Sequence, residues 1–278
     1  LAIFAFSPSL LGTFLVRSGV LVSVHAFATD PARGIFILAF LAAVIGSSLV
    51  LYAWRAPSIS RGGGFDLVSR ESLLLGNNLL LVLITALVLL GTLAPLLYDA
   101  MGWGKISVGF PWFNTMFVLF SPLMILLMGA GPLTRWKHHN PPELLRSLRV
   151  AFVVSIAAGI TAALPLLTGS ISAGVAVALS VWLLSTLLAG LRQRLQRRSG
   201  IRGLLADWKA QGGRAYYGMW IAHLGIATFI IGVTFVTQFD IEKDVRMAPG
   251  DEIELNQYLF RFEGAAQHIG PNYRAQRG

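Results

Sequence analysis

Seven long apolar runs limit the fold of this sequence more than any other feature. Each run is close to twenty residues or longer, and together they cover 1–24, 35–54, 73–98, 112–135, 150–168, 170–191 and 216–238. An α-helix rises 1.5 Å per residue, so about 20 residues cross a hydrocarbon core of ~30 Å. We therefore predict an all-α polytopic membrane protein with about seven transmembrane helices across 1–238. The turn at Thr168-Gly169-Ser170 predicts an antiparallel hairpin of the fifth and sixth helices.

Composition supports this class of protein and excludes several kinds of site. Hydrophobic residues make up 55% of the chain and charged residues 13%, whereas soluble domains contain nearer 25% charged residues. The sequence has no cysteine, which excludes disulfides, thiolate metal sites and cysteine nucleophiles within these residues. The first residue is Leu1, inside an apolar run, and the last residues are polar. We therefore expect a fragment with sequence missing on both sides.

The basic residues indicate the orientation of the helices. The net charge is +9, but most basic residues lie in alternate loops, a pattern that reflects topology rather than nucleic-acid binding. One set of loops holds fourteen of them, against Arg33 and Lys105 in the opposite loops. The fourteen are Arg55, Arg61, Arg70, Arg135, Lys137, Arg146, Arg149, Arg192, Arg194, Arg197, Arg198, Arg202, Lys209 and Arg214. The positive-inside rule places this set in the cytoplasm, and the segment after Phe239 on the outer side.

The segment 239–278 differs in character from the rest of the chain. It is polar, and Pro249-Gly250 marks a turn. Apolar residues then alternate with polar ones in short stretches, as in β-strands. We predict the beginning of a small, incomplete β domain outside the membrane.

Two histidines are candidate ligands because of where they stand in the membrane pattern. His25 lies where the first run leaves the bilayer, and His223 lies inside the last run with no other ionisable residue nearby. Ionisable groups in hydrocarbon cost several kcal/mol and mark function by default. For His223, a metal ligand and a cross-helix hydrogen bond remain as alternatives.

The depths of the two histidines exclude a shared metal. The topology places His25 at the outer surface and His223 in the inner third of the bilayer, about 20 Å apart in depth. Two trans imidazoles on one iron place their nitrogens only ~4 Å apart. If both histidines bind haem, two haems are required.

Other polar and aromatic residues receive plainer interpretations. His138 and His139 are adjacent on a basic loop. Because no cluster of carboxylates or cysteines accompanies them, a solvated loop is favoured over a metal pair. Trp103 and Trp112 fit an aromatic interface belt, with a haem or substrate platform as the alternative. Arg17, inside the first run, is assigned to pairing within the helix bundle.

Four stretches together resemble the CcmF family, the large membrane subunit of the haem lyase in bacterial cytochrome c maturation. They are GTFLVRSGVLVSVHAFATDPARG, SRESLLLGNNLLL, GMWIAHLGIA, and PGDEIELNQYLFRFEG followed by GPNY. The resemblance covers essentially the whole chain. It implies a protein of the bacterial inner membrane whose C-terminal segment is periplasmic.

The resemblance also implies a function and a set of partners. Such a protein receives haem b from the periplasmic haem chaperone CcmE and attaches its vinyl groups to the CXXCH cysteines of apocytochrome c, together with CcmH and CcmI. By resemblance, His25 is an axial ligand of the transferred haem and His223 an axial ligand of a resident b-type haem. Arg33 is a candidate for contact with a haem propionate or a lipid phosphate. No residue is assigned a catalytic role.

The family's tryptophan-rich haem-binding segment and two further histidines are absent from this sequence. We therefore expect the second ligand of each haem outside this chain, and we expect the chain alone to be inactive. Two alternatives remain: a transporter or haem exporter that uses Arg17 and His223, and a scaffold for maturation factors.

Overall fold

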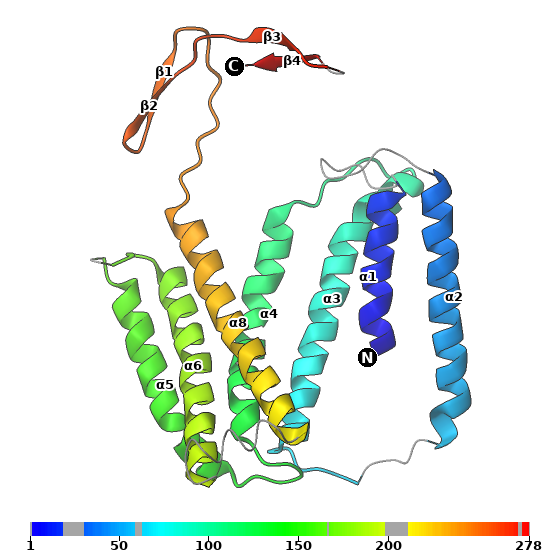
Figure 1. Ribbon diagram of the computed structural model, residues 1–278, viewed down its shortest axis with the longest axis vertical. Helices are drawn as coiled ribbons and strands as arrows, with labels where there is room; N and C mark the ends of the chain where they lie inside the picture. Colours follow the sequence, from blue (N-terminus) through cyan, green and yellow to red (C-terminus); the bar gives the residue numbers. More distant parts are fainter. Residues whose placement is uncertain are drawn as a thin grey trace. The chain divides into compact units, whose positions relative to one another are not determined.

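The computed structural model describes residues 2–18, 31–58, 63–165, 167–197, 211–271 and 274–277. Within them the chain is mostly helical, with strands only in its last part (Figure 1). The helices are α1 (Ala2–Arg17), α2 (Pro31–Arg55), α3 (Arg70–Ala100), α4 (Phe110–Ala130), α5 (Pro141–Ala163), α6 (Ile171–Arg197) and α8 (Gln211–Phe239), with short 3-10 turns at Ala56–Ser58 and Gly131–Leu133.

Six of the described helices are long and apolar enough to cross a membrane. They correspond to all the predicted runs except the first, so the chain is a multi-pass helical membrane protein. The first run is a helix over Ala2–Arg17, which by its rise covers only about 24 Å. Residues 19–24 of that run lie outside the described residues. Arg17 therefore stands in the last turn of α1 rather than in the middle of a helix.

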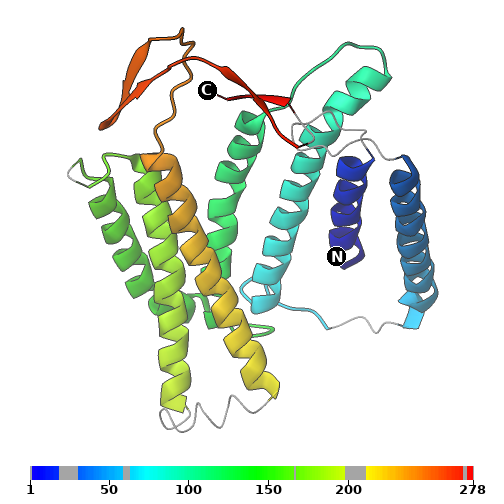
Figure 2. The same ribbon diagram turned by 45° about the horizontal axis from the view of Figure 1, so that its top comes forward.

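The chain divides into two compact units, each considered by itself below. The first comprises Leu1–Val150 and Thr186–Arg198, and the second comprises Ala151–Ser185 and Ser199–Gly278. In the first unit α1 packs on α2 and α3 packs on α4, both as antiparallel pairs (Figures 1 and 2).

The α3–α4 pair is held by a tryptophan that packs on a glycine. A Cβ built on Gly91 of α3 would lie 2.6 Å from Nε1 of Trp112 in α4. The same Nε1 donates a hydrogen bond to the Leu87 carbonyl at 3.3 Å. Trp112 is thus an interhelical packing residue, whereas Trp103 is exposed and packs edge-to-face on Tyr98.

In the second unit, the parts of α5 and α6 nearest the turn form the predicted antiparallel hairpin. Gly169 has φ +63°, a left-handed conformation that favours glycine, and the Thr168 hydroxyl donates to the Ala162 carbonyl. α5 differs from the prediction at both ends, since it begins at Pro141 and ends at Ala163. Proline is favoured in the first helical turn, so the helix starts before its apolar part does.

The segment that follows α8 folds into two antiparallel hairpins. β1 (Glu252–Leu255) pairs with β2 (Tyr258–Arg261), and β3 (Ala266–Ile269) pairs with β4 (Arg274–Arg277). In the first hairpin Ile253 lies opposite Phe260, and Glu252 forms an ion pair with Arg261 at 3.8 Å. The predicted small β region is confirmed.

Candidate functional site

His223 is the predicted ligand that the structure describes in full. Its ring Nδ1 lies 2.8 Å from the Met219 carbonyl, one helical turn earlier in α8. A carbonyl oxygen can only accept, so Nδ1 carries the hydrogen and Nε2 keeps its lone pair. Metal-ligating histidines commonly donate their other N–H in this way, which fixes the tautomer and the ring orientation. The geometry leaves Nε2 as the nitrogen able to bind iron.

The surroundings of His223 are compatible with a large flat ligand. Ala227, one turn further along the same side of α8, is fully buried, and its carbonyl accepts a hydrogen bond from Ser180 of α6 at 3.1 Å. His223 therefore lies beside the α6–α8 contact and is only partly buried. Gly218 precedes His223 in α8 and Gly225 follows it. A Cβ built on either glycine meets no atom within 4 Å, so the space beside the helix is open at both positions.

His223 lies well inside the apolar span of α8. α8 continues to Gln211, and its apolar span begins at Gly213. Helix rise then places His223 about 15 Å from the start of the span.

The other two predicted site residues cannot be placed in the same detail. His25 lies outside the described residues. Arg33 belongs to the first turn of α2, but its side chain is not among those described. The roles of His25 and Arg33 therefore remain predictions.

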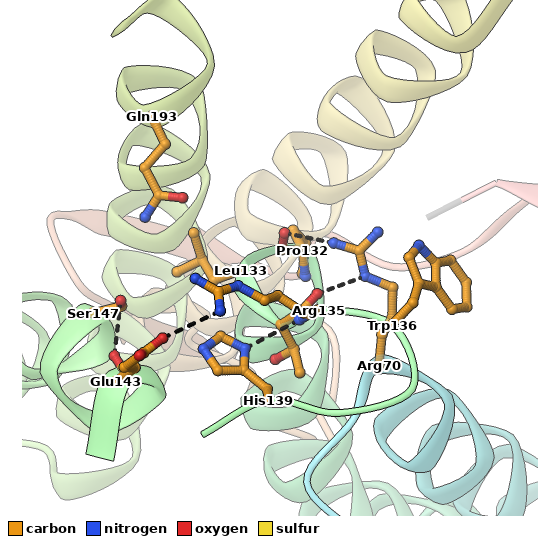
Figure 3. A pocket seen from close by; sticks show the side chains of 10 residues that line it. Arg70, Pro132, Leu133, Arg135, Trp136, His139, Glu143, Ser147 and Gln193 are labelled. Carbon is orange, nitrogen blue, oxygen red and sulfur yellow. Dashed lines mark hydrogen bonds and ion pairs between the residues drawn. The ribbon is translucent and has the colours of Figure 1, made fainter. Parts of the chain in front are cut away.

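The most elaborate polar cluster is one that the sequence reasoning missed. It joins the segment before α3 to the loop between α4 and α5, both in the first unit (Figure 3). Three backbone hydrogen bonds connect the two segments: Asp66 N–H to Lys137 O, Arg70 N–H to Arg135 O, and His139 N–H to Val68 O, each 2.8–2.9 Å. The Glu71 carboxylate accepts a hydrogen bond from the Lys137 N–H at 2.8 Å, and the His138 ring forms a hydrogen bond with the Asp66 carboxylate.

Arg70 connects this cluster to the end of α4 through hydrogen bonds from its guanidinium. Its Nε donates to the carbonyls of Gly131 (3.2 Å) and Thr134 (3.0 Å), and its Nη2 donates to the Pro132 carbonyl at 2.8 Å. The guanidinium also lies over the Trp136 ring, with the Arg70 Cζ atom 5.1 Å from the centroid of that ring. A cation at a helix C-terminus satisfies unpaired carbonyls and interacts favourably with the helix dipole.

Replacing Arg70 by methionine should destabilise the protein strongly. The change leaves three carbonyls without their charged donor, and we expect a loss of about 2–4 kcal/mol. Arg70→Lys should recover part of this loss, because lysine keeps the charge but not the planar set of donors. The measurement is the apparent Tm of purified protein in detergent. An equal fall in Tm for the exposed Arg146→Met control would contradict the role assigned to Arg70.

His139 is the clearest departure from the predicted solvated loop. Its exposed fraction is only 4%, and its Nδ1 accepts the Arg135 N–H at 3.0 Å. Burial, followed by the nearby charge of Arg135, lowers the pKa of His139 below its ordinary value, while Glu143 opposes the shift. Burial and the Arg135 charge thus both favour the neutral ring. Protonation of Nδ1 would in addition remove the acceptor for the Arg135 N–H.

The stability of the folded protein should consequently decrease as the pH falls, and His139 should account for part of that decrease. Because its pKa is lower in the folded state, the unfolded chain binds the proton first as pH decreases. The contribution of His139 to stability is then present above pH ~6.5 and is lost as pH falls through the folded pKa. We expect the apparent Tm of the wild type to fall more steeply between pH 7 and 5 than that of His139→Asn, which keeps an acceptor without titrating. Equal slopes for wild type and His139→Asn would refute the assignment.

The described residues contain no group of three or more His, Cys, Asp or Glu side chains able to hold a metal ion.

Comparison with known proteins adds a family to this geometry. A family model described as the CcmF C-terminal beta-sandwich matches residues 238–278, the segment that contains both hairpins. The cytochrome c-type biogenesis protein CcmF of Pseudomonas aeruginosa is 50% identical over 100% of this chain and 42% of its own length. The protein of the same name from Escherichia coli K12 is 44% identical over 99% of this chain and 41% of its own length.

The fold has a counterpart among solved structures. A cytochrome c heme lyase CcmF matches 98% of this chain with a TM-score of 0.64 at 23% sequence identity, over 39% of the solved chain. The helical fold with its small β region is thus shared with that protein. In each comparison the chain spans about two fifths of the length of the protein it matches.

Proposed function

This chain belongs to the CcmF family of cytochrome c-type biogenesis proteins, and we propose on that basis that it forms part of a haem lyase. Its substrates are haem b and apocytochrome c. In the reaction each CXXCH thiol adds across a haem vinyl group: a C–S bond forms, and the other vinyl carbon takes up a proton. The intact protein carries the activity, and this chain contributes the part that includes His223 and the segment after α8.

The observation that carries the proposal is the arrangement of His223. An imidazole inside an apolar helix, with Nδ1 held by the Met219 carbonyl, has the donor chemistry of an axial haem ligand. We assign its Nε2 to a resident b-type haem. That haem would supply a redox centre within the membrane.

The remaining assignments follow the family resemblance and the chain's topology. His25 is proposed to ligate the haem that is being transferred, and Arg33 to contact a propionate. The protein would reside in the bacterial inner membrane with the segment after Phe239 in the periplasm, where the haem chaperone CcmE and the partners CcmH and CcmI would meet it.

The experiment is to express the full-length protein, in wild-type form and with His25→Ala, in cells that lack their own copy. We expect His25→Ala to reduce the yield of holocytochrome c more than about tenfold, because an axial ligand positions the reacting haem. His268→Ala, an exposed position on β3, is the matched control and should retain the wild-type yield. Normal cytochrome c assembly with His25→Ala would remove His25 from the mechanism.

A further inference from the structure

A cavity of about 400 Å³ opens within the polar cluster at Arg70. Its lining includes Arg70, Trp136, His139, Glu143 and Gln193, all from the first unit. Figure 3 shows these side chains arranged around it, with the Arg135–Glu143 ion pair beside the His139 ring. None of the roles proposed for haem involves this cavity.

His139 presents a hydrogen-bond donor to the cavity. Since its Nδ1 accepts the Arg135 N–H, the hydrogen of the neutral ring is on Nε2. His139 lines the cavity, so this N–H is a hydrogen-bond donor that a ligand in the cavity can use.

A guanidinium lies next to this donor and is only loosely engaged. Arg135 pairs with Glu143 at 3.3 Å, with 65% and 48% of the two side chains exposed. Ion pairs of such exposure contribute little to stability, so an incoming anion can replace Glu143 on Arg135. The side-chain amide of Gln193 lines the same cavity and adds a further hydrogen-bonding group.

The sign of the charge and the position in the fold point to one class of ligand. With His139 neutral, the ionised lining residues are two arginines and one glutamate, which favours an anion. The cavity lies where α3 begins, α4 ends and α5 begins, at the ends of apolar spans. This is the level of lipid phosphates, and basic pockets between helices at this level bind anionic headgroups.

We propose that this cavity binds a phosphate group, held by the Nε2–H of His139 and the guanidinium of Arg135, with Glu143 as the competing anion. The phosphate belongs either to an anionic lipid headgroup or to a soluble phosphate. Arg70 and Trp136 form the wall of the site and keep the loop in place.

The test measures the apparent Tm of the purified full-length protein in detergent against increasing probe concentration, which yields an apparent Kd. The probes are inorganic phosphate and dioleoylphosphatidylglycerol in mixed micelles, with dioleoylphosphatidylcholine as the reference lipid. We expect Arg135→Gln to weaken binding about tenfold, as the loss of a charge-assisted hydrogen bond should. Glu143→Gln should tighten it about threefold, because it removes the competitor. Arg149→Gln removes the same charge from an exposed site outside the cavity and should change little.

The outcomes separate the two sources and the competing explanations. Stabilisation by phosphatidylglycerol alone identifies a lipid headgroup, and stabilisation by inorganic phosphate identifies a soluble ligand; both support the site. Stabilisation by neither probe overturns it. Equal weakening by Arg149→Gln would assign binding to general surface charge, and weaker binding in Glu143→Gln would show that Glu143 does not compete. These two results also overturn the proposal, whether or not the chain binds haem.

Discussion

Full-length protein with His223→Ala is expected to lose the absorbance of its resident haem while still accumulating in the membrane. The substitution removes Nε2, the nitrogen left for iron when Nδ1 donates to the Met219 carbonyl. Loss of an outer-shell partner alone costs about 10- to 100-fold in metal affinity. Loss of the ligand itself should therefore lower the haem-to-protein ratio more than about tenfold.

The measurement is the reduced-minus-oxidised spectrum of the purified protein, which does not depend on cytochrome c assembly. Imidazole added to His223→Ala should restore part of the signal, because it can fill the space of the missing ring. His268→Ala provides the control for an exposed histidine. Unchanged haem content in His223→Ala would refute the ligand assignment, whereas equal loss without rescue by imidazole would indicate damage to the fold.

Gly159→Ala is expected to destabilise the α5–α6 hairpin although alanine is the better helix former. A Cβ on Gly159 would lie 2.7 Å from both the Cβ of Ala178 and the carbonyl oxygen of Gly174. Overpacking of this kind costs about 1–3 kcal/mol, and a backbone carbonyl cannot move aside as a flexible side chain can. Small residues at such contacts let membrane helices approach closely.

The matched control is Gly232→Ala in α8, where a Cβ meets no atom within 4 Å. There the helix propensity of alanine should raise stability by up to about 1 kcal/mol, so the two variants should shift the apparent Tm in opposite directions. Ala178→Gly should rescue Gly159→Ala only in part, since the carbonyl contact remains. Shifts of the same sign in both glycine variants would show that the close contact is unimportant.

The helices were predictable because membrane solvation imposes a simple length and composition rule. α3, α4, α6 and α8 lie over the predicted runs, and only their ends differ. α5 shows why the ends differ. Its first turns carry Glu143 and Arg146, so a hydropathy criterion begins at Val150, but the backbone forms its helix from Pro141 onwards.

The two polar sites differ in how far the sequence could reveal them. His223 was found because an imidazole inside an apolar run stands out locally, and its hydrogen bond to Met219 is also local. The burial of His139 depends on a segment more than sixty residues earlier in the chain. No periodicity near His138 and His139 signals that packing, so the loop looked solvated. A glycine-to-tryptophan contact such as Gly91 with Trp112 is hidden from local sequence patterns for the same reason.

The hydrogen bonds between the segment before α3 and the loop after α4 also have a consequence for biosynthesis. Val68 offers its carbonyl to the N–H of His139, which the ribosome adds about seventy residues later, or about 4–14 s at typical elongation rates. α3 and α4 must both be made in that interval. The segment before α3 thus remains without its partner until both helices of that hairpin have been made, and Arg70 can bind the end of α4 only after α4 itself has been synthesised.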